Sequence, residues 1–151
     1  MAQRTGEWLR GAIARPAGTG ARQTVQDALF PDGRGVVYSR GELFAAKLDG
    51  GAPPVPVSGP LVPGGNVGTF VVLPDGSRVV YAADALQDGR NELFIARLDA
   101  SVPPRRLSHT LDPGGTVGDF QIASDGTRAV YVALEDGVTR LFSVPTEGGW
   151  P

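Results

Sequence analysis

Short runs of apolar residues alternate with turn residues along most of the chain, a pattern typical of many short β-strands. Two of these runs, "RVVYAA" at Arg78–Ala83 and "RAVYVA" at Arg128–Ala133, consist almost entirely of small and β-branched residues. Because a strand of this kind has no polar side to turn toward water, we expect both runs to be buried on both faces.

The runs that follow complete a set of strands. "ELFIARL" carries apolar side chains on both faces of a strand, with Phe94, Ala96 and Leu98 on one face and Leu93 and Ile95 on the other. "PRRLSH" at Pro104–His109 is polar and follows prolines, which is typical of an outer edge strand.

The same pattern occurs three times, and Gly114–Tyr131 repeats Gly64–Tyr81 almost residue for residue. A turn, a tyrosine and a Leu-Phe pair return in each unit. They are Pro31-Asp32-Gly33, Pro74-Asp75-Gly76 and Ser124-Asp125-Gly126, then Tyr38, Tyr81 and Tyr131, and then Leu43-Phe44, Leu93-Phe94 and Leu141-Phe142. In such a turn the aspartate bonds to the backbone and the glycine takes the left-handed conformation, so each turn predicts a hairpin.

Small sheets that are apolar on both faces must be covered on both sides, and radial stacking of the sheets achieves this. The prediction is therefore an all-β fold made of β-propeller blades of four antiparallel strands, with about three blades' worth in the chain. A linear β-solenoid is the alternative, but its rungs are usually shorter. The expected segments are an N-terminal segment with an outer strand at 1–23, repeats at 24–66 and 67–116, and a third repeat without its last strand at 117–151.

The Pro-Asp-Gly hairpins, the following "RVVY", the "ELF" strand and the closing "LDGG" resemble one class of propeller repeats. These repeats occur in TolB-like periplasmic proteins and in the propeller domains of prolyl oligopeptidase-type peptidases. The connection "GPLVPGGNVGTF" at Gly59–Phe70 is similar to that in long repeat arrays of bacterial envelope proteins. The resemblance covers about Val25–Gly149. It implies a binding scaffold in the periplasm or outside the cell, although one repeat type serves many functions.

Three blades are fewer than the roughly four to eight that propellers contain. The third unit ends before its outer strand, and the segment with Trp8, Leu9 and Ile13 stands before the first unit in the place of such a strand. We expect this segment to complete the third sheet of a second chain, so that a homodimer closes a six-bladed ring with twofold symmetry. The alternatives are a fragment of a longer array and an unusual three-bladed or filamentous arrangement.

Composition narrows the classes of function. The 151 residues suffice for one domain, and the 22 glycines and 13 prolines suit many turns. Because cysteine is absent, disulfides and thiolate chemistry are excluded. A net charge of −2 supplies no basic field, and no stretch has the length of a membrane span or the apolar core of a secretory signal. We expect no nucleic-acid partner and no membrane insertion.

Few residues offer catalytic or metal chemistry. No Gly-x-Ser-x-Gly nucleophile elbow accompanies the single histidine, so His109 is expected to be an ordinary residue of the outer edge. Asp84 and Asp88 precede Gly89 with the alternating oxygen ligands of a calcium loop, but leucine stands at the middle position. The other interpretation of Asp88-Gly89 is a hairpin turn. We expect no cofactor and no enzymatic activity.

Two further sets of residues are candidates for partner contacts. Thr69 and Asp119 occupy the same position of the innermost strand in two units, and Gln121 follows on that strand. The units differ there, which favours either binding at the channel or neutral drift. Arg105-Arg106 is either a solvated edge or a contact for an acidic partner. The predicted function is a non-enzymatic binding or scaffold module for proteins or peptides; the alternative is the non-catalytic propeller part of a prolyl oligopeptidase-type hydrolase.

Overall fold

A computed structural model describes residues 26–147, which form three antiparallel sheets and no helix. The first sheet contains, in order, β1 (Asp27–Leu29), β2 (Gly35–Arg40), β3 (Glu42–Lys47) and β4 (Val55–Pro56). The second contains β5 (Val67–Val72), β6 (Arg78–Ala83), β7 (Glu92–Arg97) and β8 (Arg105–Arg106). The third contains β9 (Thr116–Ile122), β10 (Arg128–Glu135) and β11 (Val138–Pro145). The all-β prediction is confirmed.

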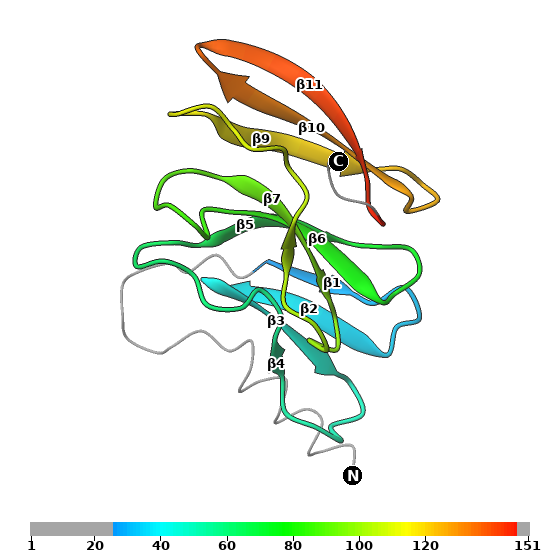
Figure 1. Cartoon of the computed structure of the whole chain (residues 1–151). Helices are drawn as coiled ribbons and strands as arrows, with labels where there is room; N and C mark the ends of the chain where they lie inside the picture. The colour runs from blue at the N-terminus through cyan, green and yellow to red at the C-terminus, as the bar shows by residue number, and fades with distance from the viewer. Residues whose placement is uncertain (1–25, 148–151) are drawn as a thin grey trace.

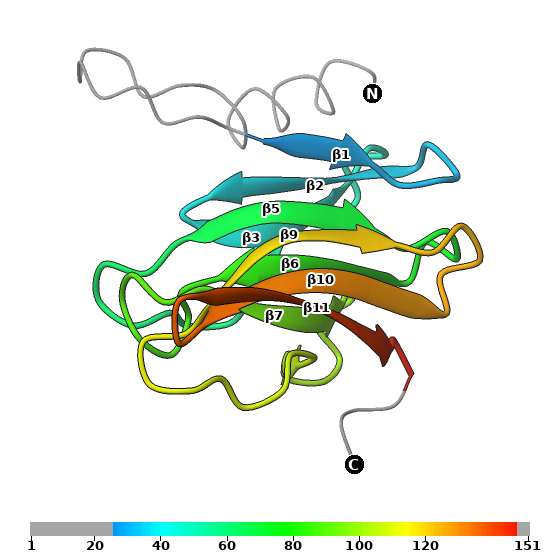
Figure 2. The ribbon, with the colours of Figure 1, turned by 90° about the horizontal axis from the view of Figure 1, so that it is seen from above.

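The sheets stack face to face with the second in the middle (Figure 1). Seen from above, the first strands β1, β5 and β9 follow one another across the stack (Figure 2). In each sheet the remaining strands follow the first one in chain order, each pairing with the strand before it. This is the strand order of propeller blades.

The first hairpin of each sheet is closed by the turn that the sequence predicts. Gly33, Gly76 and Gly126 have φ values of +71°, +70° and +74°, a conformation that glycine adopts at little cost. The aspartate of each turn accepts a hydrogen bond from the backbone N–H two residues later, at 2.8, 2.9 and 3.0 Å. The third turn keeps both features although Ser124 replaces proline.

The second sheet is buried on both faces. On β7, Leu93 and Ile95 join the core cluster shared with the third sheet. Phe94, Ala96 and Leu98 join the cluster shared with the first sheet. The sequence predicts the same division, because side chains alternate along a strand.

Neighbouring sheets are joined by hydrogen bonds that repeat from one junction to the next. The N–H of Val67 donates to the carbonyl of Gly41 at 2.7 Å, which links the second sheet to the first. The N–H of Val117 donates to the carbonyl of Asn91 at 2.8 Å, which links the third sheet to the second. The same backbone hydrogen bond therefore joins each sheet to the preceding one.

The hairpin turns also pack on one another in a repeated way. A methyl group added at Gly76 would lie 3.5 Å from the Cδ of Pro31, in the turn of the preceding sheet. At Gly126 it would lie 3.0 Å from the Cδ of Pro74. No atom in the described part of the chain comes within 4 Å of the same position on Gly33. The turn of the first sheet thus has no such neighbour among these residues.

One prediction about burial is wrong for the third sheet. The run at Arg128–Ala133 is buried on one face only, because β10 alternates between buried and exposed residues. Val130 is 36% exposed and Leu134 is 43% exposed. Among the residues that the structure describes, none covers this outer face, and the apolar pattern alone does not reveal it.

The outer strand at Pro104–His109 is shorter and less polar than predicted. Only β8 pairs with β7, and Leu107 is completely buried. Ser108 turns inward, and its Oγ accepts a hydrogen bond from the N–H of Leu93 at 3.2 Å. In the third sheet, the described residues supply three strands. Trp8, Leu9 and Ile13, which we expect to supply an outer strand, lie outside the described residues.

Candidate functional site

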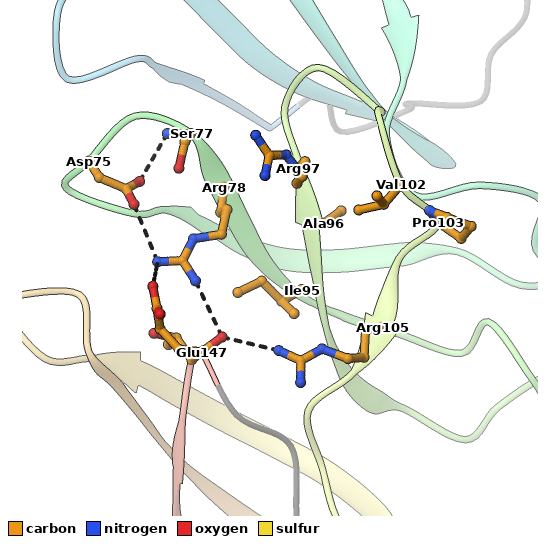
Figure 3. Close-up of a pocket in the computed structure, with 11 residues that line it drawn as sticks. Asp75, Ser77, Arg78, Ile95, Ala96, Arg97, Val102, Pro103, Arg105 and Glu147 are labelled. Atoms are coloured by element: carbon orange, nitrogen blue, oxygen red, sulfur yellow. Dashed lines mark hydrogen bonds and ion pairs between the residues drawn. The ribbon is translucent and has the colours of Figure 1, made fainter.

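A cleft of about 360 Å³ opens between the second and third sheets, beside the turn that follows β5 (Figure 3). One wall comes from the turn and the start of β6, and the opposite wall comes from β7, the following loop and β8. The end of β11 lies across it. The lining residues used below are Arg78, Arg105, Ile95, Val102, Pro103, Thr146 and Glu147.

Two arginines meet at one carbonyl oxygen in this cleft. Arg78 Nη1 lies 3.4 Å from the carbonyl oxygen of Thr146, and Arg105 Nη2 lies 3.2 Å from the same oxygen. Arg78 Nη2 also lies 3.3 Å from Asp75 Oδ2 and 3.4 Å from Glu147 Oε1. The cleft therefore gathers positive charge around a neutral acceptor (Figure 3).

Asp75 is held in its ionised form. Partial burial works in the opposite direction, but hydrogen bonds from Ser77 and Arg78 together hold the pKa of its carboxyl group below the usual value. The Asp75 carboxylate fixes the guanidinium of Arg78, which is only 20% exposed.

The corresponding cleft between the first and second sheets has a different character. Its volume is about 410 Å³, and Val55 stands at the position of Arg105. Gly35 stands at the position of Arg78, and the ring of Phe30 covers it so closely that a Cβ at Gly35 would clash. Of the two clefts, only the one between the second and third sheets contains the paired arginines. The sequence analysis did not predict this pair, although the aligned repeats show Gly35 at the position of Arg78.

His109 bridges the second and third sheets, so its interpretation as an ordinary edge residue is wrong. Its Nδ1 lies 2.8 Å from the hydroxyl of Tyr131, and its Nε2 lies 3.0 Å from Glu135 Oε1. The ring packs against Phe142 with centroids 4.2 Å apart. Both ring nitrogens are engaged in a contact between sheets.

The carboxylate of Glu135 belongs to this contact. The N–H of Asp112, 3.1 Å from Oε1, holds the pKa of Glu135 below its ordinary value. Burial opposes this shift, and His109 and Arg140 add to it. Because the folded pKa is depressed, the stabilisation is complete above the unfolded value and is lost as pH falls through the folded one.

Glu135→Gln is expected to reduce stability at neutral pH and to weaken the acid dependence of unfolding. Urea midpoints measured at neutral pH and below the ordinary glutamate pKa would test this. Asp49→Asn changes an exposed carboxylate in the loop after β3 and serves as the control. If Glu135→Gln keeps the acid dependence of the unchanged chain, Glu135 does not carry it.

The predicted channel residues fall into two places. β5 and β9 each contain an irregularity in register, and Thr69 and Asp119 lie at these equivalent points and are exposed. Such bulges redirect a side chain. Gln121 pairs with Val130 and therefore shares the outer face of the third sheet. The structure does not bring Gln121 together with Thr69 and Asp119.

The carboxylate of Asp84, in the loop proposed for calcium, is bound by backbone N–H groups. The carboxylate of Asp84 accepts hydrogen bonds from the N–H of Asn66 and, at 3.0 Å, from that of Gly89. Although burial opposes the shift, these bonds and Asp88 lower the pKa of Asp84. Asp88 lies beside Gly64. The calcium hypothesis for Asp84 and Asp88 stays a prediction.

Within 26–147 there is no group of three or more histidine, aspartate or glutamate side chains arranged to hold a metal ion. The same part of the chain has no helix with the length and apolar character that a membrane crossing requires.

Stacked antiparallel sheets of three or four strands with this order and these turns define a propeller-type fold. A TolB protein from Agrobacterium tumefaciens matches with a TM-score of 0.60 and 19% identity, over 86% of this chain and 45% of that one. The tricorn protease matches with a TM-score of 0.60 and 11% identity, over 88% of this chain and 14% of that one. The fold is therefore TolB-like, and the chain spans less than half of either protein. No family model and no curated protein matches.

Proposed function

We propose that the chain is a non-enzymatic binding or scaffold module for protein or peptide partners, and that it completes its propeller by pairing with a second copy. The observation that carries the proposal is the outer face of the third sheet, which no part of the described chain, 26–147, covers.

That outer face is equivalent to two faces that are covered. Leu43 and Leu93 are completely buried because a following sheet packs on them, whereas Leu141 at the same repeat position is 71% exposed. Val37 and Val80 are completely buried, and Val130 at their position is 36% exposed. The face therefore has the shape and chemistry of a surface on which another blade packs.

The first sheet has an equivalent outer face at the other end of the stack, and most of that face is already buried in the single chain. In each sheet a stacked Tyr-Phe pair lies on one face, and in the second and third sheets that face meets the preceding sheet. In the first sheet the pair is Tyr38 and Phe44, on the face opposite the second sheet. On this face Tyr38 and Val36 are 3% and 5% exposed, and Leu29, at 62%, is the large apolar residue left open to a partner. The turn at Gly33 is open to receive a neighbouring turn such as that of Ser124.

Pairing with a second copy places a neighbouring sheet against the outer faces of both the first and the third sheet. The third sheet of one copy covers the first sheet of its partner and the reverse, which gives a closed assembly with twofold symmetry and six blades. Leu141, Leu134 and Val130 then become core residues. Covering three such side chains contributes on the order of several kcal/mol.

An introduced thiol tests this arrangement. Ser143 pairs with Val130 on the outer face, and its equivalents Ala45 and Ile95 are 4% and 5% exposed. In Ser143→Cys the thiol is expected to react with a maleimide more slowly as protein concentration rises, because association buries it.

Ser101→Cys is the matched control, since this residue lies in an exposed loop. Its thiol should react at one rate at all concentrations. Equal, concentration-independent rates for the two variants would contradict pairing through the outer face.

The second candidate is the non-catalytic propeller part of a larger hydrolase. It is favoured by the similarity to the tricorn protease, of which this chain matches 14%. In that case the outer face packs on a further blade of the same polypeptide. The isolated 151-residue chain would then remain a monomer in the thiol experiment.

A further inference from the structure

The cleft between the second and third sheets contains more positive charge than its own carboxylates bind. Arg105 donates to the carbonyl of Thr146, and no carboxylate within 26–147 pairs with it. Arg78 donates to the same carbonyl. Two guanidinium groups thus share one neutral oxygen, an arrangement that a carboxylate would stabilise further.

The one carboxylate that reaches the cleft from the third sheet is easily displaced. Glu147 lies 3.4 Å from Arg78, but its side chain is 80% exposed. An ion pair this open to water contributes little to stability. An incoming carboxylate therefore exchanges with Glu147 at small cost, while Asp75 keeps Arg78 in place.

Apolar residues lie beside the arginines. Ile95, Val102 and Pro103 line the cleft beside the arginines; Ile95 is buried, whereas Val102 is 53% exposed (Figure 3). A ligand with an aliphatic group next to its carboxylate fits this combination. The exposed Val102 and Pro103 contact the aliphatic part, and the guanidinium groups donate to the two carboxylate oxygens.

The fold does not require arginine at positions 78 and 105. The equivalent cleft between the first and second sheets has Gly35 and Val55 at the same positions and still joins its sheets. Structural necessity therefore does not explain Arg78 and Arg105, whereas ligand recognition does.

We propose that this cleft is a carboxylate-binding site for a peptide, in which Arg78 and Arg105 bind the carboxylate and Val102 contacts a neighbouring aliphatic side chain. The proposal rests on the proposed function and names the chemistry of its peptide partner. The carboxylate comes either from an acidic side chain or from a peptide C-terminus.

Backbone amide shifts of the full chain, followed by NMR during titration with three peptides, test the proposal. Acetyl-Ala-Val-Glu-Ala-amide offers only a side-chain carboxylate, and acetyl-Ala-Val with a free C-terminus offers only a terminal one. Acetyl-Ala-Val-Gln-Ala-amide offers neither. Saturable shifts at Arg78, Arg105 and Thr146 are expected with at least one charged peptide and not with the neutral peptide.

Arg105→Gln is expected to weaken the binding of that peptide about tenfold, because a charge-assisted hydrogen bond is lost. Lys47→Gln is the matched control, because it removes one exposed positive charge from the equivalent cleft between the first and second sheets. Equal binding of the neutral peptide, an unchanged affinity in Arg105→Gln, or no shifts with any peptide would overturn the site.

The sedimenting mass of the same samples separates the two proposals. If the chain associates but no charged peptide shifts the cleft residues, only the carboxylate site is wrong. If a charged peptide binds to a chain that stays monomeric, only the pairing of copies is wrong.

Discussion

Replacing Leu93 by alanine is expected to lower the free energy of unfolding by about 3 kcal/mol. Leu93 is completely buried in the cluster between the second and third sheets, with Leu107 and Val117 nearby in the same cluster. Strands held in two paired sheets cannot move in to fill the space, so the substitution leaves a cavity as well as removing apolar contact.

Urea unfolding followed by tyrosine fluorescence or circular dichroism measures this effect. Leu86→Ala is the control, because Leu86 is 60% exposed in a loop and its change should stay within about 0.5 kcal/mol. A loss for Leu93→Ala no larger than that of the control would show that the second and third sheets do not pack through this cluster.

Leu141→Asp is expected to raise the dissociation constant of the paired copies at least about a hundredfold, because pairing would bury an uncompensated carboxylate. The fold of the single chain should be little affected, since Leu141 is 71% exposed. Circular dichroism should therefore be unchanged while association is lost.

Leu86→Asp introduces the same charge at a similarly exposed leucine away from the outer face. Association of this control should match that of the unchanged chain. Equal association of the two variants would mean that Leu141 is not in the interface.

Much of the fold follows from the sequence because its signals are local. Turn chemistry fixes Gly33, Gly76 and Gly126, and side-chain alternation assigns Leu93 and Phe94 to opposite faces correctly. Neither inference requires knowledge of what packs against the sheet. The repeat then carries the arrangement of one blade over to the next.

What the sequence did not reveal depends on neighbours. The apolar run of β10 reads like that of β6, and only the absence of a covering sheet among the described residues makes Val130 exposed. His109 gains its role from Tyr131 and Glu135, which come from a different sheet. One signal was available: the aligned repeat has Gly59 and Ala85 at the positions of His109 and Glu135, so the two change together.

The sequence predicts only part of the candidate cleft. The sequence left Arg105 open as a contact for an acidic partner, but it gave no reason to connect Arg105 with Arg78. The two are brought together because β8 and the start of β6 both lie beside the end of β11, where Thr146 accepts from each. That meeting depends on sheet stacking and not on local pattern.

Sedimentation equilibrium of the unchanged chain over a wide range of concentration tests the central claim most directly. Pairing through the outer face of the third sheet predicts twice the chain mass of 15.7 kDa at high concentration, falling toward 15.7 kDa on dilution. A mass of 15.7 kDa at every concentration would contradict it.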